Sequence, residues 1–216
     1  LCDAYMNNCV YIEINPLPEA MITGDNEICL GESTQLTVTF TQGTPPFDIA
    51  IEGVPYNNIS VNPFITWVTP ATSGTHTYNI TYLEDANGCQ NNGTGMATVI
   101  VNPLPVVEIN YSMGTPCVGQ TLYLYGSPNG ATYEWYGPKG FIGSMQNPVI
   151  PNVDLTDMGY YKLIVVDAKG CIDSAEVYIT IHPNPVALPV GDEVCVGDDI
   201  TILGGSFVDL ANGGGS

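Results

Sequence analysis

The chain has 216 residues, 44% of them hydrophobic, and its 22 acidic residues against three lysines and no arginine give a formal net charge of −19. This charge excludes nucleic-acid binding, which needs a basic surface, and it opposes docking on an anionic membrane. No apolar run approaches the roughly 18 residues of a membrane-spanning helix, and the length suits one large domain or two to three small ones.

The composition predicts an all-β protein. The 24 glycines, 17 prolines and 13 tyrosines, with many Val, Ile and Thr, are typical of short strands joined by tight turns. No window of about a dozen residues has apolar positions at helical spacing, so little helix is expected.

The start of the chain carries a pattern that returns twice. Residues 2–18, CDAYMNNCVYIEINPLP, align without a gap with residues 89–105, CQNNGTGMATVIVNPLP. Residues 171–185, CIDSAEVYITIHPNP, follow the same plan. A second motif, Cys-x-Gly before a strand-like run, begins at Cys29, Cys117 and Cys195. Repetition of this kind indicates a tandem array.

These motifs divide the chain into four segments. Residues 1–18 are the C-terminal end of a truncated repeat, 19–105 and 106–185 are two whole repeats, and 186–216 is the N-terminal part of another truncated repeat. Cys2 and Cys9 in the first segment are candidates for a local disulfide. The sequence thus predicts a piece of a longer array, with Pro-x-Pro pairs as short, stiff linkers.

In the first whole repeat, apolar and polar residues alternate as in strands with one buried face. Residues 36–40, 47–51 and 75–83 follow this alternation, and a strand at 97–101 ends before proline. About seven short strands separated by turn signals predict a β-sandwich.

The second whole repeat has more specific features. Trp135, within TYEWYG, is placed like the core tryptophan of an immunoglobulin-like domain. An Asp-x-Gly-x-Tyr corner is formed by Asp157, Gly159 and Tyr161. Gly126 and Leu163 stand where the usual inter-sheet cysteines would be. The predicted fold is therefore all-β, with tandem immunoglobulin-like β-sandwich domains in a head-to-tail array.

Seven cysteines without a CxxC pair favour disulfides in an oxidising compartment over a zinc site. Pairing within a repeat would join Cys29 with Cys89, and Cys117 with Cys171. In a standard sandwich, however, a strand of about 26 Å separates such positions, whereas a disulfide needs Cα atoms within about 7 Å. A bond of Cys29 with Cys171, across the hinge at 103–105, is the alternative. Both pairings remain open at this point.

Three motifs in combination resemble a known family. They are Cys-x-Gly before a strand, Asp-Ala-Asn-Gly-Cys at 85–89 and Val-Asn-Pro-Leu-Pro at 101–105. They resemble the immunoglobulin-like and PKD-like repeats of giant type IX-secreted cell-surface adhesins of gliding Bacteroidota, the SprB type. The resemblance implies an extracellular filament for surface attachment or gliding motility. It implies neighbouring repeats, a surface polysaccharide, or outer-membrane motility or secretion machinery as partners.

Two smaller features have plainer interpretations beside them. Asp173-Ser174-Ala175 resembles the Bacteroidota O-glycosylation signal with Ser174 as the acceptor, although so short a motif also arises by chance. Acidic clusters near repeat ends, at 24–27, 83–87, 191–193 and 197–199, offer oxygen ligands for structural calcium. No spacing specifies a calcium site, and solvated turns are the plainer interpretation. No cofactor is expected.

Catalysis is not expected either, because only two histidines are present, His76 and His182, and no nucleophile or phosphate-binding motif occurs. The predicted function is that of a stalk or filament segment of an extracellular cell-surface adhesin. The alternative is a spacer or glycan-binding module of a secreted polysaccharide-degrading enzyme, with Tyr136 and Phe141 as candidate contacts.

Overall fold

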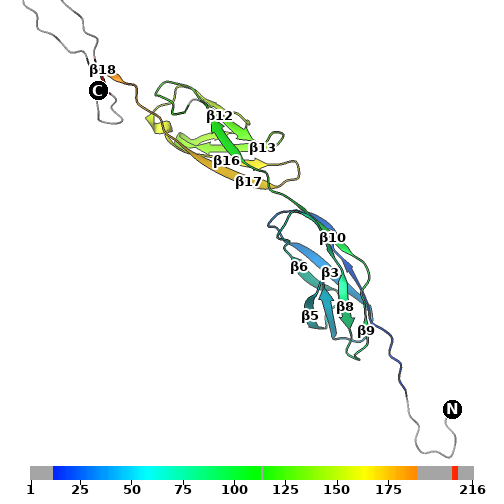
Figure 1. Ribbon diagram of the computed structural model, residues 1–216. Coiled ribbons are helices and arrows are strands. Elements are labelled where there is room, and N and C mark those ends of the chain that lie inside the picture. The colour runs from blue at the N-terminus through cyan, green and yellow to red at the C-terminus, as the bar shows by residue number, and fades with distance from the viewer. Residues whose placement is uncertain (1–11, 113, 189–205, 209–216) are drawn as a thin grey trace, which may run out of the picture. The chain divides into compact units, whose positions relative to one another are not determined.

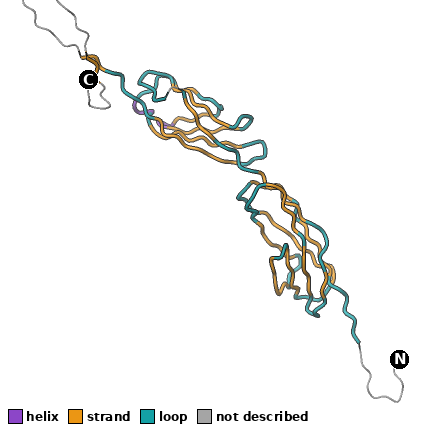
Figure 2. Tube along the Cα trace, in the orientation of Figure 1, coloured by secondary structure: helices purple, strands orange, loops and turns teal. Residues whose placement is uncertain are grey.

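A computed structural model describes residues 12–112, 114–188 and 206–208, and the chain divides into unit 1, Leu1–Pro103, and unit 2, Leu104–Ser216 (Figure 1). Both units consist mainly of strands joined by loops, and unit 2 also has short helical turns (Figure 2). Cys2, Cys9, Cys195 and the acidic clusters at 191–193 and 197–199 lie outside the described residues.

The described part of unit 1, from residue 12 on, contains ten strands in three hydrogen-bonded groups, β1-β3-β6, β2-β10-β7 and β5-β4-β8-β9. Their bounds are β1 Glu19–Thr23, β2 Asn26–Cys29, β3 Thr34–Gln42, β4 Phe47–Ile51, β5 Val54–Ile59, β6 Phe64–Val68, β7 Gly74–Tyr78, β8 Ile80–Glu84, β9 Gln90–Asn91 and β10 Ala97–Asn102. The first two strands pair with different neighbours: β1 pairs antiparallel with β3, whereas β2 pairs parallel with β10.

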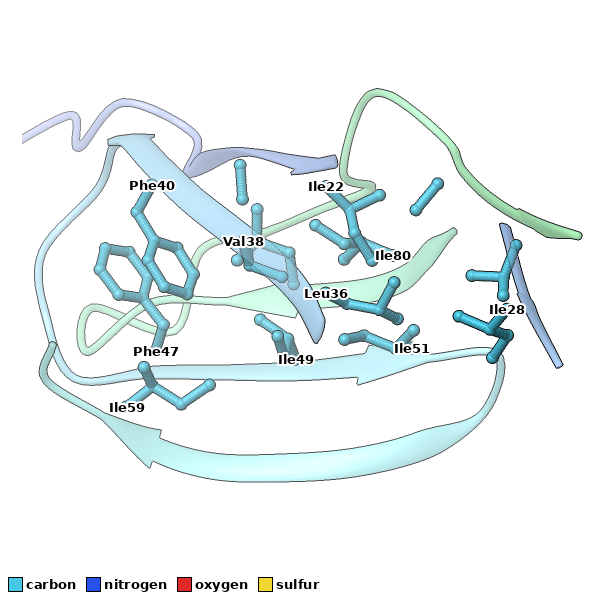
Figure 3. Packing of buried hydrophobic residues seen from close by; sticks show 14 of the residues in the cluster. Ile22, Ile28, Leu36, Val38, Phe40, Phe47, Ile49, Ile51, Ile59 and Ile80 are labelled. Carbon is cyan, nitrogen blue, oxygen red and sulfur yellow. The ribbon is translucent and has the colours of Figure 1, made fainter. Parts of the chain in front are cut away.

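The core of unit 1 lies between these layers (Figure 3). Leu36, Val38 and Phe40 of β3 are buried, as their alternation predicts, and their side chains point toward β4, which carries Phe47, Ile49 and Ile51 (Figure 3). The rings of Phe40 and Phe47 stack with centroids 4.2 Å apart. Burial of this apolar surface on both layers is the main source of stability for the unit.

The predicted strand at 75–83 is broken in the structure. Strands β7 and β8 are separated at Asn79, and the register with β4 shifts between Ala50 and Ile51. Because of this irregularity, Ile80 and Leu83 are the buried residues and Tyr82 is exposed. Continuous alternation through this segment was therefore the wrong prediction.

Unit 2 has the groups β11-β12-β15 and β14-β13-β16-β17, and the small pair β18-β19. Their bounds are β11 Glu108–Tyr111, β12 Leu122–Ser127, β13 Thr132–Gly137, β14 Phe141–Gly143, β15 Val149–Ile150, β16 Gly159–Val166, β17 Ile172–Ile179, β18 Val186–Leu188 and β19 Ser206–Val208. Two single helical turns are η1, Pro138–Gly140, and η2, Leu155–Asp157.

Two residues singled out in the sequence form the centre of unit 2. Trp135 is fully buried, and its indole N–H donates to the backbone oxygen of Met145 at 3.0 Å. Tyr161 is also fully buried, and its hydroxyl donates to the backbone oxygen of Asp157 at 3.0 Å. This is the tyrosine corner that the Asp-x-Gly-x-Tyr pattern predicts.

Direct packing replaces the usual inter-sheet disulfide. A Cβ on Gly126 would lie 2.8 Å from Leu163 Cδ2 and 3.1 Å from Trp135 Cζ2, so the leucine fills the space beside the glycine. With two packed layers, a core tryptophan and a tyrosine corner, the fold is all-β and built of immunoglobulin-like β-sandwich domains.

Candidate functional site

Cys29 lies at the C-terminal end of unit 1, where the chain leaves the sandwich. The parallel register of β2 and β10 sets it opposite Asn102, and the Leu30 N–H donates to the Asn102 carbonyl at 2.9 Å. The Cys29 N–H donates to a carboxylate oxygen of Glu32 at 2.9 Å. The Glu32 N–H donates back to the Cys29 carbonyl at 3.0 Å. These reciprocal bonds close a tight turn directly after the cysteine.

Cys117 has the same geometry at the C-terminal end of unit 2. It forms a parallel bridge with His182, and the Val118 N–H donates to the His182 carbonyl at 2.9 Å. Gln120 replaces Glu32: its side-chain oxygen accepts from the Cys117 N–H at 2.8 Å, and its N–H donates to the Cys117 carbonyl at 3.1 Å. The amide oxygen of Gln120 accepts a hydrogen bond as the carboxylate of Glu32 does, so the two motifs form turns of the same kind.

The turn at 85–89 is organised by one carboxylate. Asp85 is buried, and its Oδ1 accepts from the N–H groups of Asn87 at 3.0 Å and Cys89 at 3.1 Å. Its Oδ2 accepts from the Thr44 N–H at 3.1 Å. The bond from Thr44, followed by those from Cys89 and Asn87, holds the pKa of Asp85 below its usual value. Gly88 supplies the positive φ of 73° that the turn needs.

The turn at 167–171 repeats this arrangement. The Asp167 Oδ1 accepts from the N–H groups of Lys169 at 2.8 Å and Cys171 at 2.9 Å. Asp167 donates to the Cys171 carbonyl at 3.0 Å, and Gly170, at φ 86°, donates to the Asp167 carbonyl at 3.1 Å. The repeated sequence therefore encodes a repeated carboxylate-centred hairpin that ends in a cysteine.

Each hairpin lies at the N-terminal end of its unit. In unit 1, Asn91 Nδ2 donates to the backbone oxygen of Pro18, which directly precedes β1, at 3.0 Å. In unit 2, the first residue of β11, Glu108, pairs with Ser127 at the end of β12. The next strand then begins at Thr132, opposite Val166, which precedes the hairpin.

The two cysteines of a unit are consequently far apart. In unit 2, β17 runs for eight residues from the Cys171 hairpin toward His182, which neighbours Cys117. Eight strand residues span about 26 Å, whereas a disulfide needs Cα atoms within about 7 Å. Cys89 and Cys117 have free thiols, while Cys29 and Cys171 are disulfide-bonded. The predicted pairings within a repeat, Cys29 with Cys89 and Cys117 with Cys171, are therefore wrong.

A cavity of about 360 Å³ adjoins the free thiol of Cys117. It is lined by Cys117, His182, Pro183 and Pro185. The Cys117 side chain is half-buried. The thiol thus borders a space at the end of the unit, next to the prolines that lead out of it.

The acidic clusters serve the backbone in the described residues. Asp25 accepts from the Thr98 N–H at 2.6 Å, and Asp85 accepts from three backbone N–H groups. No group of three or more metal-binding side chains occurs within residues 12–112, 114–188 and 206–208. The structure does not bring the acids at 24–27 and 83–87 into a cation site.

Tyr136 and Phe141 have different surroundings. Tyr136 is exposed, and its hydroxyl donates to a Glu134 carboxylate oxygen at 3.1 Å, which raises the Tyr136 pKa. Phe141 is half-buried against Tyr161, with ring centroids 6.0 Å apart. Of the two candidate glycan contacts, Phe141 therefore packs on the core, whereas Tyr136 is exposed. Ser174 is exposed on β17.

A lysine bridge between η1 and η2 was not predicted from the sequence. Lys139 Nζ lies 3.0 Å from a carboxylate oxygen of both Asp154 and Asp157. Bonds from the Thr156 hydroxyl and N–H, and then from Lys139, lower the Asp154 pKa to about 2. Lys139 has a positive φ of 56°, which alternation in sequence does not indicate.

No helix in the described part of the chain is long and apolar enough to cross a membrane. Comparisons with protein-family models and with curated proteins find no match.

Several solved structures of immunoglobulin domains are similar to the chain. The IG1 and IG2 domains of DIP-gamma align with a TM-score of 0.39 and 11% identity, over 78% of this chain and 99% of that one. The amphioxus IgVJ-C2 molecule aligns with a TM-score of 0.33 and 15% identity, over 71% and 99%. The N-terminal eight Ig domains of Down Syndrome Cell Adhesion Molecule align with a TM-score of 0.44 and 14% identity, over 81% and 25%. The likeness concerns the fold alone.

Proposed function

We propose that the chain is a structural segment of an extracellular cell-surface adhesin, in which immunoglobulin-like units follow one another head to tail as a stalk or filament. The supporting observation is the placement of the cysteines, one at the C-terminal end and one at the N-terminal end of each unit. Such a placement suits joints between successive units, because neither cysteine reaches the other within its own unit.

The joint that we assign is a disulfide of Cys29 with Cys171. Cys29 lies at the end where unit 1 leads into the linker, and Cys171 lies at the end where the chain enters unit 2. Both are disulfide-bonded, and the other two described cysteines, Cys89 and Cys117, have free thiols. The bond would bypass the hinge at 103–105, so that tension passes through both a peptide linker and a covalent clamp.

The proposed location is outside the cell, at its surface. Disulfide-bonded cysteines favour an oxidising compartment. A net charge of −19 keeps neighbouring filaments soluble and apart. Export by the type IX pathway and a role in surface attachment or gliding motility follow from the resemblance of the repeat motifs, and they belong to this proposal.

Non-reducing peptide mapping of the oxidised chain tests the joint. We expect a cross-linked peptide that contains Cys29 and Cys171. Antibodies against the chain are expected to label intact source cells, and deletion of the gene is expected to reduce their attachment. A secreted parent protein that carries a catalytic domain, and whose loss leaves attachment unchanged, would contradict the adhesin.

A glycan-binding module is the second candidate, favoured by aromatic residues on the outer face of one sheet. Tyr160 and Tyr178 are exposed and form an edge-to-face pair with centroids 5.0 Å apart. Tyr136 lies on β13 of the same sheet. Loss of binding on a glycan panel for Tyr136→Ala and Tyr160→Ala, with folding intact, would support this candidate. Absence of binding by the unaltered chain would remove it.

A further inference from the structure

We infer that the free thiols of Cys117 and Cys89 each belong to a joint of the same kind as Cys29–Cys171. Each thiol forms its disulfide with a cysteine of a neighbouring repeat. Cys117 would bond to the cysteine of an Asp-x-x-Gly-Cys hairpin in a following repeat. Cys89 would bond to the cysteine of a Cys-x-Gly strand in a preceding repeat. This inference rests on the proposed function and names the partner of each thiol.

The first support is the equivalence of Cys117 and Cys29. Cys29 pairs in parallel register with Asn102 and Cys117 with His182, and each cysteine is held by a reciprocal pair of hydrogen bonds with the residue three positions on. Cys29 is disulfide-bonded and Cys117 is free. Because the backbone around the two cysteines is alike, Cys117 presents its thiol as Cys29 does.

The second support is the cavity beside Cys117. It is lined by the thiol, by His182 and by Pro183 and Pro185, all within unit 2. A hairpin that arrives along the chain beyond these prolines would enter this space next to the thiol. A repeat of the same kind carries such a hairpin at its N-terminal end, as both whole units of this chain do.

The third support is the pair of hairpins. Cys89 and Cys171 accept from and donate to the equivalent aspartates with distances that agree within 0.2 Å, at 3.1 and 3.1 Å for Cys89 and at 3.0 and 2.9 Å for Cys171. Cys171 is nevertheless fully buried, whereas Cys89 is half-buried. A hairpin of one design thus occurs once with its cysteine covered and bonded, and once with its thiol accessible.

The chemistry of the joint is thiol–disulfide exchange. Two thiols lose two protons and two electrons as one S–S bond forms, and an external disulfide accepts them and becomes two thiols. A small-molecule disulfide such as oxidised glutathione is sufficient as the oxidant. Repeated at every linker, the reaction would produce one clamp per linker along the array.

A lengthened chain tests the inference. Residues 106–185 are inserted a second time after Pro185, so that the unaltered unit 2 is followed by a repeat of known sequence. The purified chain is oxidised with glutathione disulfide, digested without reduction and mapped by mass spectrometry. We expect one peptide that joins Cys29 with Cys171, and a second that joins Cys117 with the cysteine of the inserted hairpin. The matched control, Cys117→Ser, should lose only the second peptide.

The two levels of the proposal can be separated in the same digest. If Cys117 still reacts with an alkylating reagent after oxidation, while the Cys29–Cys171 peptide is present, this inference is wrong and the Cys29–Cys171 joint is retained. Absence of both peptides from a chain that circular dichroism shows to be folded would overturn the proposed joint as well. Duplication of residues 19–105 provides the reciprocal test, with Cys89 of the downstream copy bonded to the cysteine of the upstream Cys-x-Gly strand.

Discussion

Asp167 and Cys171 are joined by two hydrogen bonds: the Asp167 N–H donates to the Cys171 carbonyl at 3.0 Å, and the Cys171 N–H donates to the Asp167 carboxylate at 2.9 Å. Asp85 and Cys89 do the same at 3.1 Å in both directions. A single carboxylate thus holds the backbone that carries each hairpin cysteine, both at the free thiol of Cys89 and at the disulfide-bonded Cys171.

Replacement of the hairpin carboxylate should destabilise unit 1. Asp85→Ala removes the acceptor of three backbone N–H groups, from Thr44, Asn87 and Cys89, which would then lose their partners. We expect the Tm of unit 1 to fall by several degrees in differential scanning calorimetry. Glu19→Ala, an exposed acidic residue of β1, is the control and should leave the Tm nearly unchanged. Equal effects of the two variants would contradict the role of Asp85.

The same carboxylate makes the stability of unit 1 depend on acid. The pKa of Asp85 is lowered in the folded state, so its contribution is present above the unfolded pKa of about 3.9 and is lost as pH falls through the folded value. Urea unfolding from pH 6 to pH 2 should show a decline below about pH 4 that is weaker in Asp85→Asn. An unchanged pH profile in Asp85→Asn would refute this origin.

The tyrosine corner of unit 2 gives a closely matched pair of variants. Tyr161→Phe removes the hydroxyl that donates to the Asp157 carbonyl in the core, and we expect a loss of about 1–2 kcal/mol in the free energy of unfolding. Its neighbour Tyr160 is exposed, so Tyr160→Phe should cost far less. Burial, and then Asp157, raises the Tyr161 pKa to about 12. The unit should therefore lose stability as pH rises above about 10, where unfolded tyrosine ionises, and Tyr161→Phe should weaken this loss.

The two tryptophans of the chain should report on the two units separately. Trp135 is fully buried in unit 2, whereas Trp67 in unit 1 is 64% exposed. Fluorescence of Trp67→Phe, which retains Trp135, should be blue-shifted and should move to the red on unfolding. Fluorescence of Trp135→Phe should already be red-shifted, and this variant should also lose stability, because it leaves a cavity and frees the Met145 carbonyl. Similar emission from both variants would contradict the burial of Trp135.

The contact of Gly126 with Leu163 can be tested by a double-mutant cycle. Gly126→Ala places a Cβ 2.8 Å from Leu163 Cδ2, and we expect a loss of about 1–3 kcal/mol from overpacking. In the background of Leu163→Ala the same change should cost less, because the leucine side chain is gone. Additive losses in urea unfolding would show that the two residues do not share this space.

Much of the fold could be predicted because short-range patterns report burial. Alternation identified Leu36, Val38 and Phe40, and motif spacing identified Trp135 and Tyr161. The parallel pairing of β2 with β10 could not be read in this way, since alternation states which face is buried and not which strand lies alongside. The break at Asn79 escaped notice for a related reason, because it depends on a register shift in the facing strand β4.

The site was predicted in part. Repetition indicated the two cysteine motifs, but not that the reciprocal bonds of Glu32 and Gln120 make them equivalent turns. The surroundings of Phe141 depend on Tyr161, which is distant in sequence. The bridge from Lys139 to Asp157 likewise joins two helical turns whose proximity only the folded sandwich creates.

The carboxylate-centred hairpin also bears on how such a chain can change over time. The contacts that the two hairpins share use the aspartate, the glycine and the backbone. The Asn87 side chain adds a bond to Thr44 in one copy, yet Lys169 occupies the same position in the other copy without altering the turn. The outward side chains of the hairpin are therefore open to variation while its frame persists. A protein built of such repeats could duplicate, exchange or diversify whole repeats, because the hairpin at the end of each repeat depends on so few residues.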